Sequence, residues 1–226
     1  MTPLADRVAL VTGASRGIGR AICLALAEAG ATLVGTATSE AGAESTCREV
    51  RKLGRRALAL AGDVSVAADA DRWVAEAERA FGRIDVLVNN AGIVRRIRTV
   101  QMTDDDFDRV VKVNLNGPFY LARRVLPGML ERKWGRILNV SSISGTVGTA
   151  GSTGYCASKW GLNGLTEALA EEVRGSGVVV AAILPGSVKT DMLEGSGYEP
   201  VLSPAEVAQT VRFLCAEAPS AINGSL

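Results

Sequence analysis

Tyrosine and lysine stand four positions apart in the segment YCASK, at Tyr155 and Lys159, and this pair could move a proton. On a helix, residues four apart share one face. A phenol has an ordinary pKa of about 10, and a nearby ammonium group lowers it by favouring the phenolate. Ser142, thirteen residues before Tyr155, could donate a hydrogen bond to a carbonyl oxygen, or be an ordinary turn serine. Together the three side chains would suit acid–base chemistry on a carbonyl group, whereas the tyrosine–lysine spacing alone is common by chance.

The chain contains no histidine, so this proton transfer must depend on another residue type. The absence excludes catalysis by Ser-His-Asp or Cys-His groups and zinc held by histidine. Asn114 is a further polar candidate, because asparagine is a poor helix former and this one lies within a long helical pattern. It is either a tolerated polar residue or the site of a local bend that directs its amide toward a water molecule.

A glycine-rich loop near the N-terminus could hold phosphate groups. An apolar run is followed by the segment TGASRGIG, from Thr12 to Gly19, and then by a helical pattern. Gly13 permits a tight turn, Gly17 lets the backbone approach a pyrophosphate, and Gly19 allows close packing of helix on strand. The free N–H groups of the helix would favour phosphate. The spacing is GxxxGxG rather than GxGxxG, and a structural turn is the alternative, but the strand–loop–helix context favours dinucleotide binding.

The residues after the second apolar run indicate which dinucleotide is preferred. They read Gly35-Thr36-Ala37-Thr38-Ser39, without the Asp or Glu that would bind the ribose 2′-hydroxyl of NAD. Hydroxyl groups do not repel a 2′-phosphate, and Arg16 could add a positive charge. The pattern favours NADP(H) over NAD(H), although these hydroxyls could also simply cap the next helix.

Two more clusters follow apolar runs. Asp63-Val64 comes after the third run, where the carboxylate could accept from an adenine amino group or cap the next helix. Asn89-Asn90-Ala91-Gly92 comes after the fourth, where small residues leave room for a flat ligand and the amides can tie strand ends together. That segment could equally be an ordinary turn.

Strands that alternate with helices must position these groups, and the alternation predicts a parallel sheet. The strands are nearly continuous apolar runs, which is typical of strands covered by helices on both faces. We therefore expect an α/β fold with a Rossmann-type doubly wound parallel sheet, in a single domain over 1–226. In such a sheet, ligands bind beyond the carboxyl ends of the strands. The expected strands are 7–11, 31–35, 57–61, 85–89, 136–140 and 178–184; the expected helices are 17–29, 40–53, 67–81, 104–132 with a break near Gly117-Pro118, 155–174 and 204–217.

Composition excludes several other classes of protein. The 226 residues carry 25 Lys+Arg against 24 Asp+Glu, a formal charge of +1, which argues against nucleic-acid binding. No apolar stretch is long enough to span a membrane and the N-terminus does not resemble a signal peptide, so we expect a cytoplasmic protein. The cysteines are scattered without a CxxC pair, which predicts buried thiols rather than a metal or disulfide site; they are Cys23, Cys47, Cys156 and Cys215.

These motifs, in this order over nearly the whole chain, resemble those of the classical short-chain dehydrogenase/reductase family. TGASRGIG, NNAG, Asn114, Ser142 with YCASK, and Pro185-Gly186 followed by Thr190 carry the resemblance. The glycine loop, GTATSE and the run from GRILNVSSISG to YCASK look most like 3-oxoacyl-[acyl-carrier-protein] reductases. The resemblance implies an NADP(H)-dependent oxidoreductase that transfers a hydride to a ketone carbon.

The resemblance also implies a role for each matching residue. Tyr155 would be the general acid, Lys159 would lower its pKa and hold the nicotinamide ribose, Ser142 would polarise the carbonyl, and Asn114 would position a water. No metal is implied. The residues expected to line the cofactor are Thr12, Gly13, Ser15, Arg16, Gly17, Ile18, Gly19, Thr36, Ala37, Thr38, Asp63, Val64, Asn90, Ala91, Gly92, Tyr155, Lys159, Pro185, Gly186, Val188 and Thr190.

The chain departs from the family pattern at two places. The segment that usually forms a helical lid over the substrate is short here, about 191–203, and rich in glycine and proline. The sequence also stops where relatives continue into a final edge strand, so we expect that strand to be missing. Because that strand often builds a subunit interface, a homotetramer is in doubt, while a homodimer through helices 115–130 and 161–173 is expected.

The expected substrate is a small carbonyl compound, which could be carried on acyl-carrier protein. Arg95, Arg96 and Arg98 could steer that acidic partner, or be ordinary surface charges. An arginine found in comparable reductases falls about where Ser176 stands, which weakens the carrier-protein interpretation, although Arg174 is close. The alternatives are reduction of another ketone, sugar or steroid-like substrate and, in a different class, a non-catalytic NADP-sensing protein.

Overall fold

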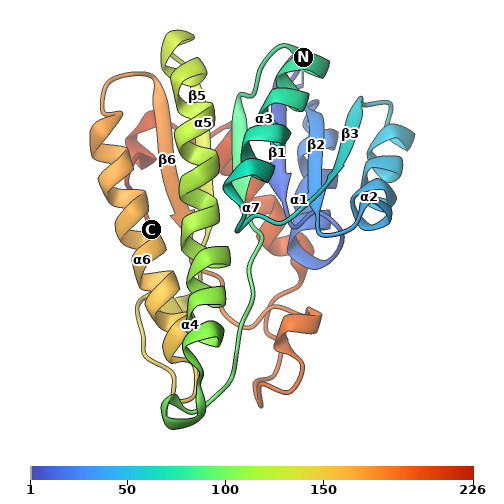
Figure 1. Ribbon diagram of the computed structural model, residues 1–226. Coiled ribbons are helices and arrows are strands. Elements are labelled where there is room, and N and C mark those ends of the chain that lie inside the picture. The colour runs from blue at the N-terminus through green and yellow to red at the C-terminus, as the bar shows by residue number, and fades with distance from the viewer. Residues whose placement is uncertain (1) are drawn as a thin grey trace.

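A six-stranded parallel sheet forms the centre of the computed structural model, which describes residues 2–226 (Figure 1). The strand order is β3-β2-β1-β4-β5-β6, and every neighbouring pair is parallel. The order turns in opposite directions from β1, which is the doubly wound arrangement expected from the sequence. The strands are β1 (Val8–Thr12), β2 (Thr32–Ala37), β3 (Ala57–Ala61), β4 (Val86–Asn89), β5 (Gly135–Val140) and β6 (Val178–Ile183).

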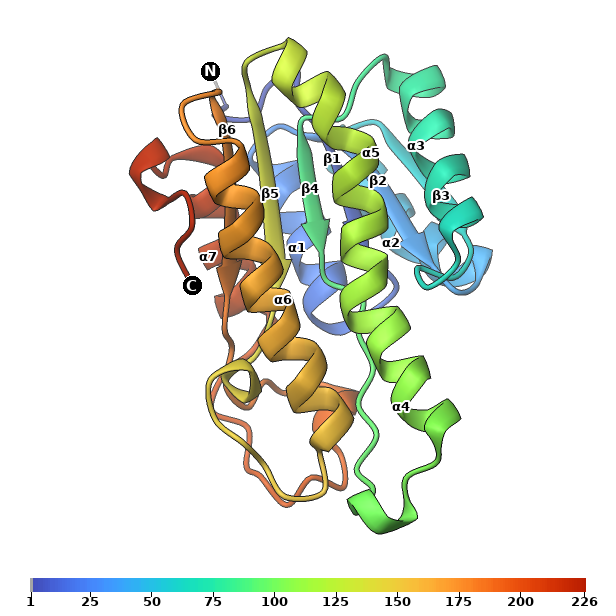
Figure 2. The same cartoon turned by 60° about the vertical axis from the view of Figure 1, so that its left-hand side comes forward.

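Helices cover both faces of this sheet (Figure 2). Three of them, α3, α5 and α6, pack on one face, and α1, α2 and α7 pack on the other. Short α4 continues into α5 and lies against α6. The helices are α1 (Gly17–Glu28), α2 (Glu40–Lys52), α3 (Ala67–Phe81), α4 (Asp104–Val111), α5 (Gly117–Glu131), α6 (Thr153–Glu172) and α7 (Pro204–Ala216).

Alternate residues of each strand belong to two separate apolar cores. In β1, Val8 and Leu10 join the core under α3, α5 and α6, whereas Ala9 and Val11 join the core under α1, α2 and α7. Side chains of successive strand residues point to opposite faces, so a strand buried on both sides must be apolar throughout. The four cysteines are buried, as the sequence suggested.

The element boundaries agree closely with those expected, apart from the long pattern at 104–132. The expected break lies near Gly117-Pro118, but α5 already begins at Gly117. The irregularity comes just before it, as a π-helical turn at Lys112–Asn116 that joins α4 to α5. Pro118 lies in the first turn of α5, where proline is tolerated, and does not end the helix.

The edge of the sheet at β6 has a short further partner. Gly224 donates its backbone N–H to Val180 O at 2.8 Å, and Ala182 N donates to Ser225 O at 2.9 Å. Residues 2–226 contribute six strands to the sheet and no seventh. No helix among these residues is sufficiently long and apolar to span a membrane.

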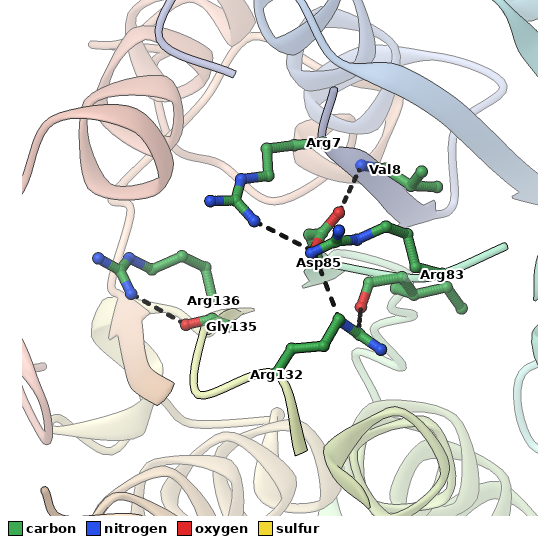
Figure 3. A network of polar contacts seen from close by, with 8 residues as sticks. Arg7, Val8, Arg83, Asp85, Arg132, Gly135 and Arg136 are labelled. Carbon is green, nitrogen blue, oxygen red and sulfur yellow. Dashed lines mark hydrogen bonds and ion pairs between the residues drawn. The ribbon is translucent and has the colours of Figure 1, made fainter. Parts of the chain in front are cut away.

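Arginines surround one buried carboxylate where the sheet's strands begin (Figure 3). Asp85 accepts from the backbone N–H of Val8 at 3.0 Å and from Arg83 Nε at 2.8 Å. Arg7 and Arg132 lie 3.5 and 3.9 Å from the same carboxylate. Asp85 is fully buried. This network joins the starts of β1 and β4, at the end of the sheet opposite the glycine loop and Tyr155.

Candidate active site

The expected functional residues lie at the end of the sheet where the strands finish. The glycine loop follows β1, the NNAG segment follows β4, Ser142 follows β5 and Pro185-Gly186 follows β6. In Figure 2 the strand arrows point toward this end, and the segments around 93–103, 141–152 and 190–203 extend beyond it. Parallel strands therefore bring residues from distant parts of the sequence to one edge.

The glycine loop packs closely on the end of β4. Gly13 has φ +65° and Gly17 has φ +52°, a backbone conformation that glycine adopts easily. A Cβ at Gly19 would lie 2.1 Å from Gly13 O, so only glycine fits there. The first turn of α1 can therefore fold directly over the loop.

The beginning of α1 has unpaired backbone donors. No side chain among residues 2–226 caps α1, whereas Ser39, Thr103 and Ser203 cap α2, α4 and α7. A helix N-terminus without a cap presents free N–H groups and the positive end of the helix dipole. This part of the structure is thus well suited to a phosphate group.

Thr12 and Asn90 hold the ends of β1 and β4 together. The Thr12 hydroxyl accepts from the backbone N–H groups of Asn90 and Ala91, at 3.0 and 2.9 Å. In return, Asn90 Nδ2 donates to Thr12 O at 2.8 Å. These bonds fix the start of the glycine loop against the segment that leads to Gly92.

The end of β2 carries no acidic residue before Glu40, the first residue of α2. Thr36 is buried and its carbonyl oxygen accepts from Ala14 N at 2.9 Å, while Thr38 is exposed. Ser39 caps α2 by accepting from Gly42 N, so one of the hydroxyls does have a capping role.

Arg16 and Asp63 have protein partners. Arg16 Nε lies 3.2 Å from Asp191 in an exposed ion pair. Asp63 accepts from the backbone and hydroxyl of Ser65 and from Arg109 at 2.7 Å. Burial acts to raise the pKa of Asp63, but these hydrogen bonds outweigh it and lower the pKa. Asp63 does not cap α3, which begins after Val66; Val64 beside it is buried against Gly117.

Tyr155 and Lys159 lie in the first turns of α6 with their side chains adjacent. Lys159 Nζ is 5.7 Å from the centre of the Tyr155 ring and donates to Val140 O at 2.8 Å. Burial lowers the pKa of Lys159 from 10.5 to about 8. Burial also raises the pKa of Tyr155, and a hydrogen bond with the Ser142 hydroxyl opposes that rise only partly. The protein side chains alone thus keep the phenol protonated.

Asn114 lies in the π-helical turn and is completely buried. Its Oδ1 accepts from Ile93 N and its Nδ2 donates to Ile93 O, both at 2.9 Å, and Nδ2 also lies 3.0 Å from Ser158 Oγ. Ser158 in turn donates to Tyr155 O at 2.7 Å. Asn114 therefore joins the segment after β4 to the helix that carries Tyr155.

The remaining expected residues line the far side of the site. Ile143 N donates to Pro185 O at 3.2 Å, which connects the turn after Ser142 with the Pro185-Gly186 segment. Val188 is buried and pairs with Leu202, and a Cβ at Gly17 would lie 3.2 Å from Thr190 Cγ2. Thr190 thus adjoins the glycine loop, next to the partly exposed Ser15 and Ile18.

The structure reveals participants that the sequence patterns did not indicate. Ser158 links Asn114 to Tyr155, as described above. Asn139 and Thr166 are two more: Asn89, whose amide was expected to tie strand ends together, donates from Nδ2 to Asn139 Oδ1 at 2.9 Å, and Asn139 Nδ2 donates to Thr166 at 2.8 Å, which ties β4 and β5 to α6. Their only signal in the sequence is a polar residue in an apolar strand or helix face, which does not identify a partner.

Comparison with known proteins agrees with this geometry. The model of the short chain dehydrogenase family matches residues 7–199. A 3-oxoacyl-[acyl-carrier-protein] reductase of Synechocystis is 41% identical, over 96% of this chain and 92% of the relative. The corresponding reductase of Pseudomonas aeruginosa is 40% identical, over 98% and 95%. The crystal structure of a putative short-chain alcohol dehydrogenase from Sinorhizobium meliloti has a TM-score of 0.93 and 36% identity, over 98% of this chain and 94% of that one.

The doubly wound parallel sheet, together with the relatives named above, identifies the protein as an oxidoreductase with a Rossmann-type fold. The chain belongs to the short-chain dehydrogenase/reductase family, which confirms the resemblance inferred from its motifs. Enzymes of this family use a nicotinamide cofactor. The uncapped N-terminus of α1, the close packing at Gly19 and the small residues Ala91 and Gly92 are compatible with such a group.

Proposed function

We propose that this protein is an NADP(H)-dependent reductase that converts the ketone of a 3-oxoacyl thioester into a secondary alcohol. The observation that carries the proposal is the convergence of Ser142, Tyr155 and Lys159 beside the carboxyl ends of β4 and β5. A binding-only protein has no physical need for a phenol, an amine and a hydroxyl held together in this way. The named relatives support the substrate class.

Each of these residues has a distinct part in the proposed reaction. The Ser142 hydroxyl orients and polarises the substrate carbonyl, and Tyr155 donates its proton to the oxygen. The bound NADPH supplies the hydride. A protonated phenol suits the donor role, and burial keeps Tyr155 in that form. Lys159 stabilises the phenolate left after transfer, because a nearby positive charge favours the ionised form.

Asn114 and the cofactor-lining residues complete the proposed site. Asn114 positions a water that returns a proton toward Lys159, from a place fixed by its bonds to Ile93 and Ser158. The free N–H groups of α1 bind the pyrophosphate. We propose that the cofactor is lined by the set expected from the sequence: Thr12, Gly13, Ser15, Arg16, Gly17, Ile18, Gly19, Thr36, Ala37, Thr38, Asp63, Val64, Asn90, Ala91, Gly92, Tyr155, Lys159, Pro185, Gly186, Val188 and Thr190.

Preference for NADP(H) is supported by the end of β2. Thr38 and Ser39 are exposed there, and no carboxylate precedes Glu40, so a 2′-phosphate meets hydroxyl groups rather than a negative charge. Arg16 is exposed on the adjoining loop and can exchange its partner Asp191 for a phosphate. Charge-assisted bonds of this kind are stronger than neutral ones.

The surroundings of the site suit an acyl chain. The segments that extend past the strand ends carry exposed apolar residues, among them Val100, Val147 and Met192. We propose that 191–203 is the substrate lid of a single domain spanning 1–226, and that the acyl group can be carried on acyl-carrier protein. We also propose a homodimer through α5 and α6, where Phe119 and Trp160 are exposed.

The test follows the absorbance of the reduced nicotinamide with a short 3-oxoacyl thioester. We expect turnover with NADPH, and a Tyr155→Phe variant with less than roughly one hundredth of the wild-type kcat and unchanged NADPH binding. Tyr120→Phe, on α5, is the matched control and should stay active. Oxidation of NADPH with other ketones only would refute the thioester substrate. A Tyr155→Phe variant that keeps a tenth of the activity would refute the acid.

A further inference from the structure

Two arginines from opposite sides of the site reach the same short turn. Arg96, in the segment after β4, donates from Nη2 to Met192 O at 2.9 Å. Arg16, in the glycine loop, is paired with Asp191 at 3.2 Å. Asp191 and Met192 belong to the 3₁₀ turn Asp191–Leu193, which begins the 191–203 segment. The start of the proposed lid is thus attached to both walls of the site.

The segment that carries Arg96 is itself fixed to the helix of Tyr155. Ile97 N donates to Gly151 O at 2.8 Å, and the hydroxyls of Thr99 and Thr153 lie 2.8 Å apart. These contacts begin one residue after Arg96 and end two residues before Tyr155. Arg96 and the phenol therefore have a common support, and the lid is attached to that support through Arg96.

Among the described residues, the positive charge of Arg96 has no carboxylate partner, unlike that of Arg95. Arg95 lies 3.8 Å from Asp106, but within residues 2–226 no carboxylate lies within 4 Å of Arg96. Its positive charge is not neutralised by an ion pair and acts on the phenol: burial raises the pKa of Tyr155, and the Ser142 hydrogen bond and Arg96 both lower it. Lys159 and Cys156, from the phenol's own helix, are the other ionisable groups that face it.

We propose that Arg96 is a positioning residue for this reductase: it holds the 191–203 lid against the wall beside Tyr155 and places an unpaired positive charge near the reacting phenol. The proposal rests on the proposed function for its kinetic consequences, but the attachment of the lid does not depend on the substrate. Substitutions of Arg96 can separate its two proposed roles, which are to hold the lid and to supply the positive charge. Arg96→Lys keeps the charge and loses the guanidinium geometry, Arg96→Gln keeps a donor and loses the charge, and Arg96→Met loses both.

Hydrogen exchange tests the attachment without any substrate. Amide groups of Leu193 and Glu194 are protected by bonds within the turn, to Thr190 O and Asp191 O. A net hydrogen-bond contribution of about 1 kcal/mol predicts that Arg96→Met speeds exchange in peptides spanning 190–196 by about three- to tenfold. Arg98→Met is the matched control, because Arg98 has no side-chain hydrogen bond or ion pair to another described residue. Equal exchange in both variants would overturn the attachment.

Steady-state kinetics with a free thioester tests the effect on the reaction. We expect Arg96→Met to raise KM for the ketone several-fold with NADPH affinity unchanged, since the lid covers the substrate. Loss of the positive charge raises the pKa of Tyr155. The pH limb of kcat should therefore move to higher pH in Arg96→Gln and Arg96→Met but not in Arg96→Lys.

The outcomes distinguish this inference from the proposed function. Wild-type turnover of the thioester, with no change in KM or in the pH limb in Arg96→Met, would overturn the role of Arg96 and leave the proposed function standing. Faster exchange in Arg96→Met, with no thioester turnover by the wild type, would refute the proposed substrate and support the attachment of the lid.

Discussion

Lys159 is an amine with 4% of its surface exposed, and burial lowers its pKa from 10.5 to about 8. Below pH 8 the folded protein therefore carries a buried charge, and this shift corresponds to about 3 kcal/mol of lost stability. Between about pH 8 and 10 the unfolded chain binds more protons, so stability rises with pH. The ammonium group beside Tyr155 therefore lowers the stability of the fold, and functional sites are often destabilising in this way.

Replacing Lys159 with an uncharged residue should raise the stability of the fold and lower the activity. For Lys159→Met without cofactor, we expect unfolding at pH 7 to require about 2 kcal/mol more than in the wild type, because the charge is removed at the loss of one hydrogen bond to Val140 O. The gain should vanish near pH 10, while kcat falls at both values. Urea unfolding at the two pH values measures this, and a variant less stable than the wild type at pH 7 would contradict the cost assigned to the buried charge.

Ala37, the last residue of β2, offers a test of cofactor choice at a single position. A carboxylate there should repel a 2′-phosphate and accept a hydrogen bond from the ribose of NADH. We expect Ala37→Asp to shift the ratio of kcat/KM for NADPH over NADH toward NADH by roughly tenfold or more, which is about 1.4 kcal/mol. Ala37→Asn has the same shape without the charge and should shift it far less. Equal ratios in the two variants would place the 2′-phosphate elsewhere.

Between α4 and α5, the π-helical turn is an element built around one side chain. The backbone groups of Ile93 bond to the Asn114 side chain rather than to another strand: Asn114 accepts from the Ile93 N–H and donates to the Ile93 carbonyl oxygen. Because these groups are buried, Asn114→Ala leaves them without partners, and we expect a loss of about 2–4 kcal/mol in the free energy of unfolding. Asn116→Ala, in the same turn and without a side-chain bond to the described residues, should cost less than about 1 kcal/mol. Urea denaturation measures both, and similar losses would show that the turn, rather than Asn114, carries the stability.

The order of elements could be predicted from the sequence because each element is determined by its own pattern. The bounds of β3 and α3 are the same as expected, since apolar runs and helical periodicity are local signals. A local bend at Asn114 was one of two alternatives that the sequence offered, and the π-helical turn lies there, but the sequence could not show that Asn114 bonds to Ile93, twenty-one positions away. The candidate residues were likewise found by motif, whereas the contacts of Arg96 with Met192 and of Arg16 with Asp191 arise only from the folded loops.

At the scale of the whole molecule, the two covered faces of the sheet present different outer surfaces. Helices α5 and α6 cover the same face of the sheet (Figures 1 and 2). A Cβ at Gly161, on α6, would lie 2.9 Å from Leu115 in the π-helical turn just before α5. Phe119 and Trp160 are exposed on this side, and Phe213 is exposed on α7, on the other. Large exposed aromatic residues are typical centres of protein interfaces. The sequence favoured the first of these surfaces for a dimer, and the contrast between them makes that preference testable.

Trp160 is 54% exposed and Phe213 is 49% exposed, so substitution of either removes a comparable apolar surface. If α5 and α6 form the dimer, Trp160→Glu should weaken it by roughly thirtyfold or more in Kd, because a buried charge replaces an aromatic contact of at least 2 kcal/mol. Phe213→Glu should leave the dimer intact. Sedimentation equilibrium of the three proteins measures the difference. Dissociation by Phe213→Glu alone would instead assign the interface to the face covered by α7.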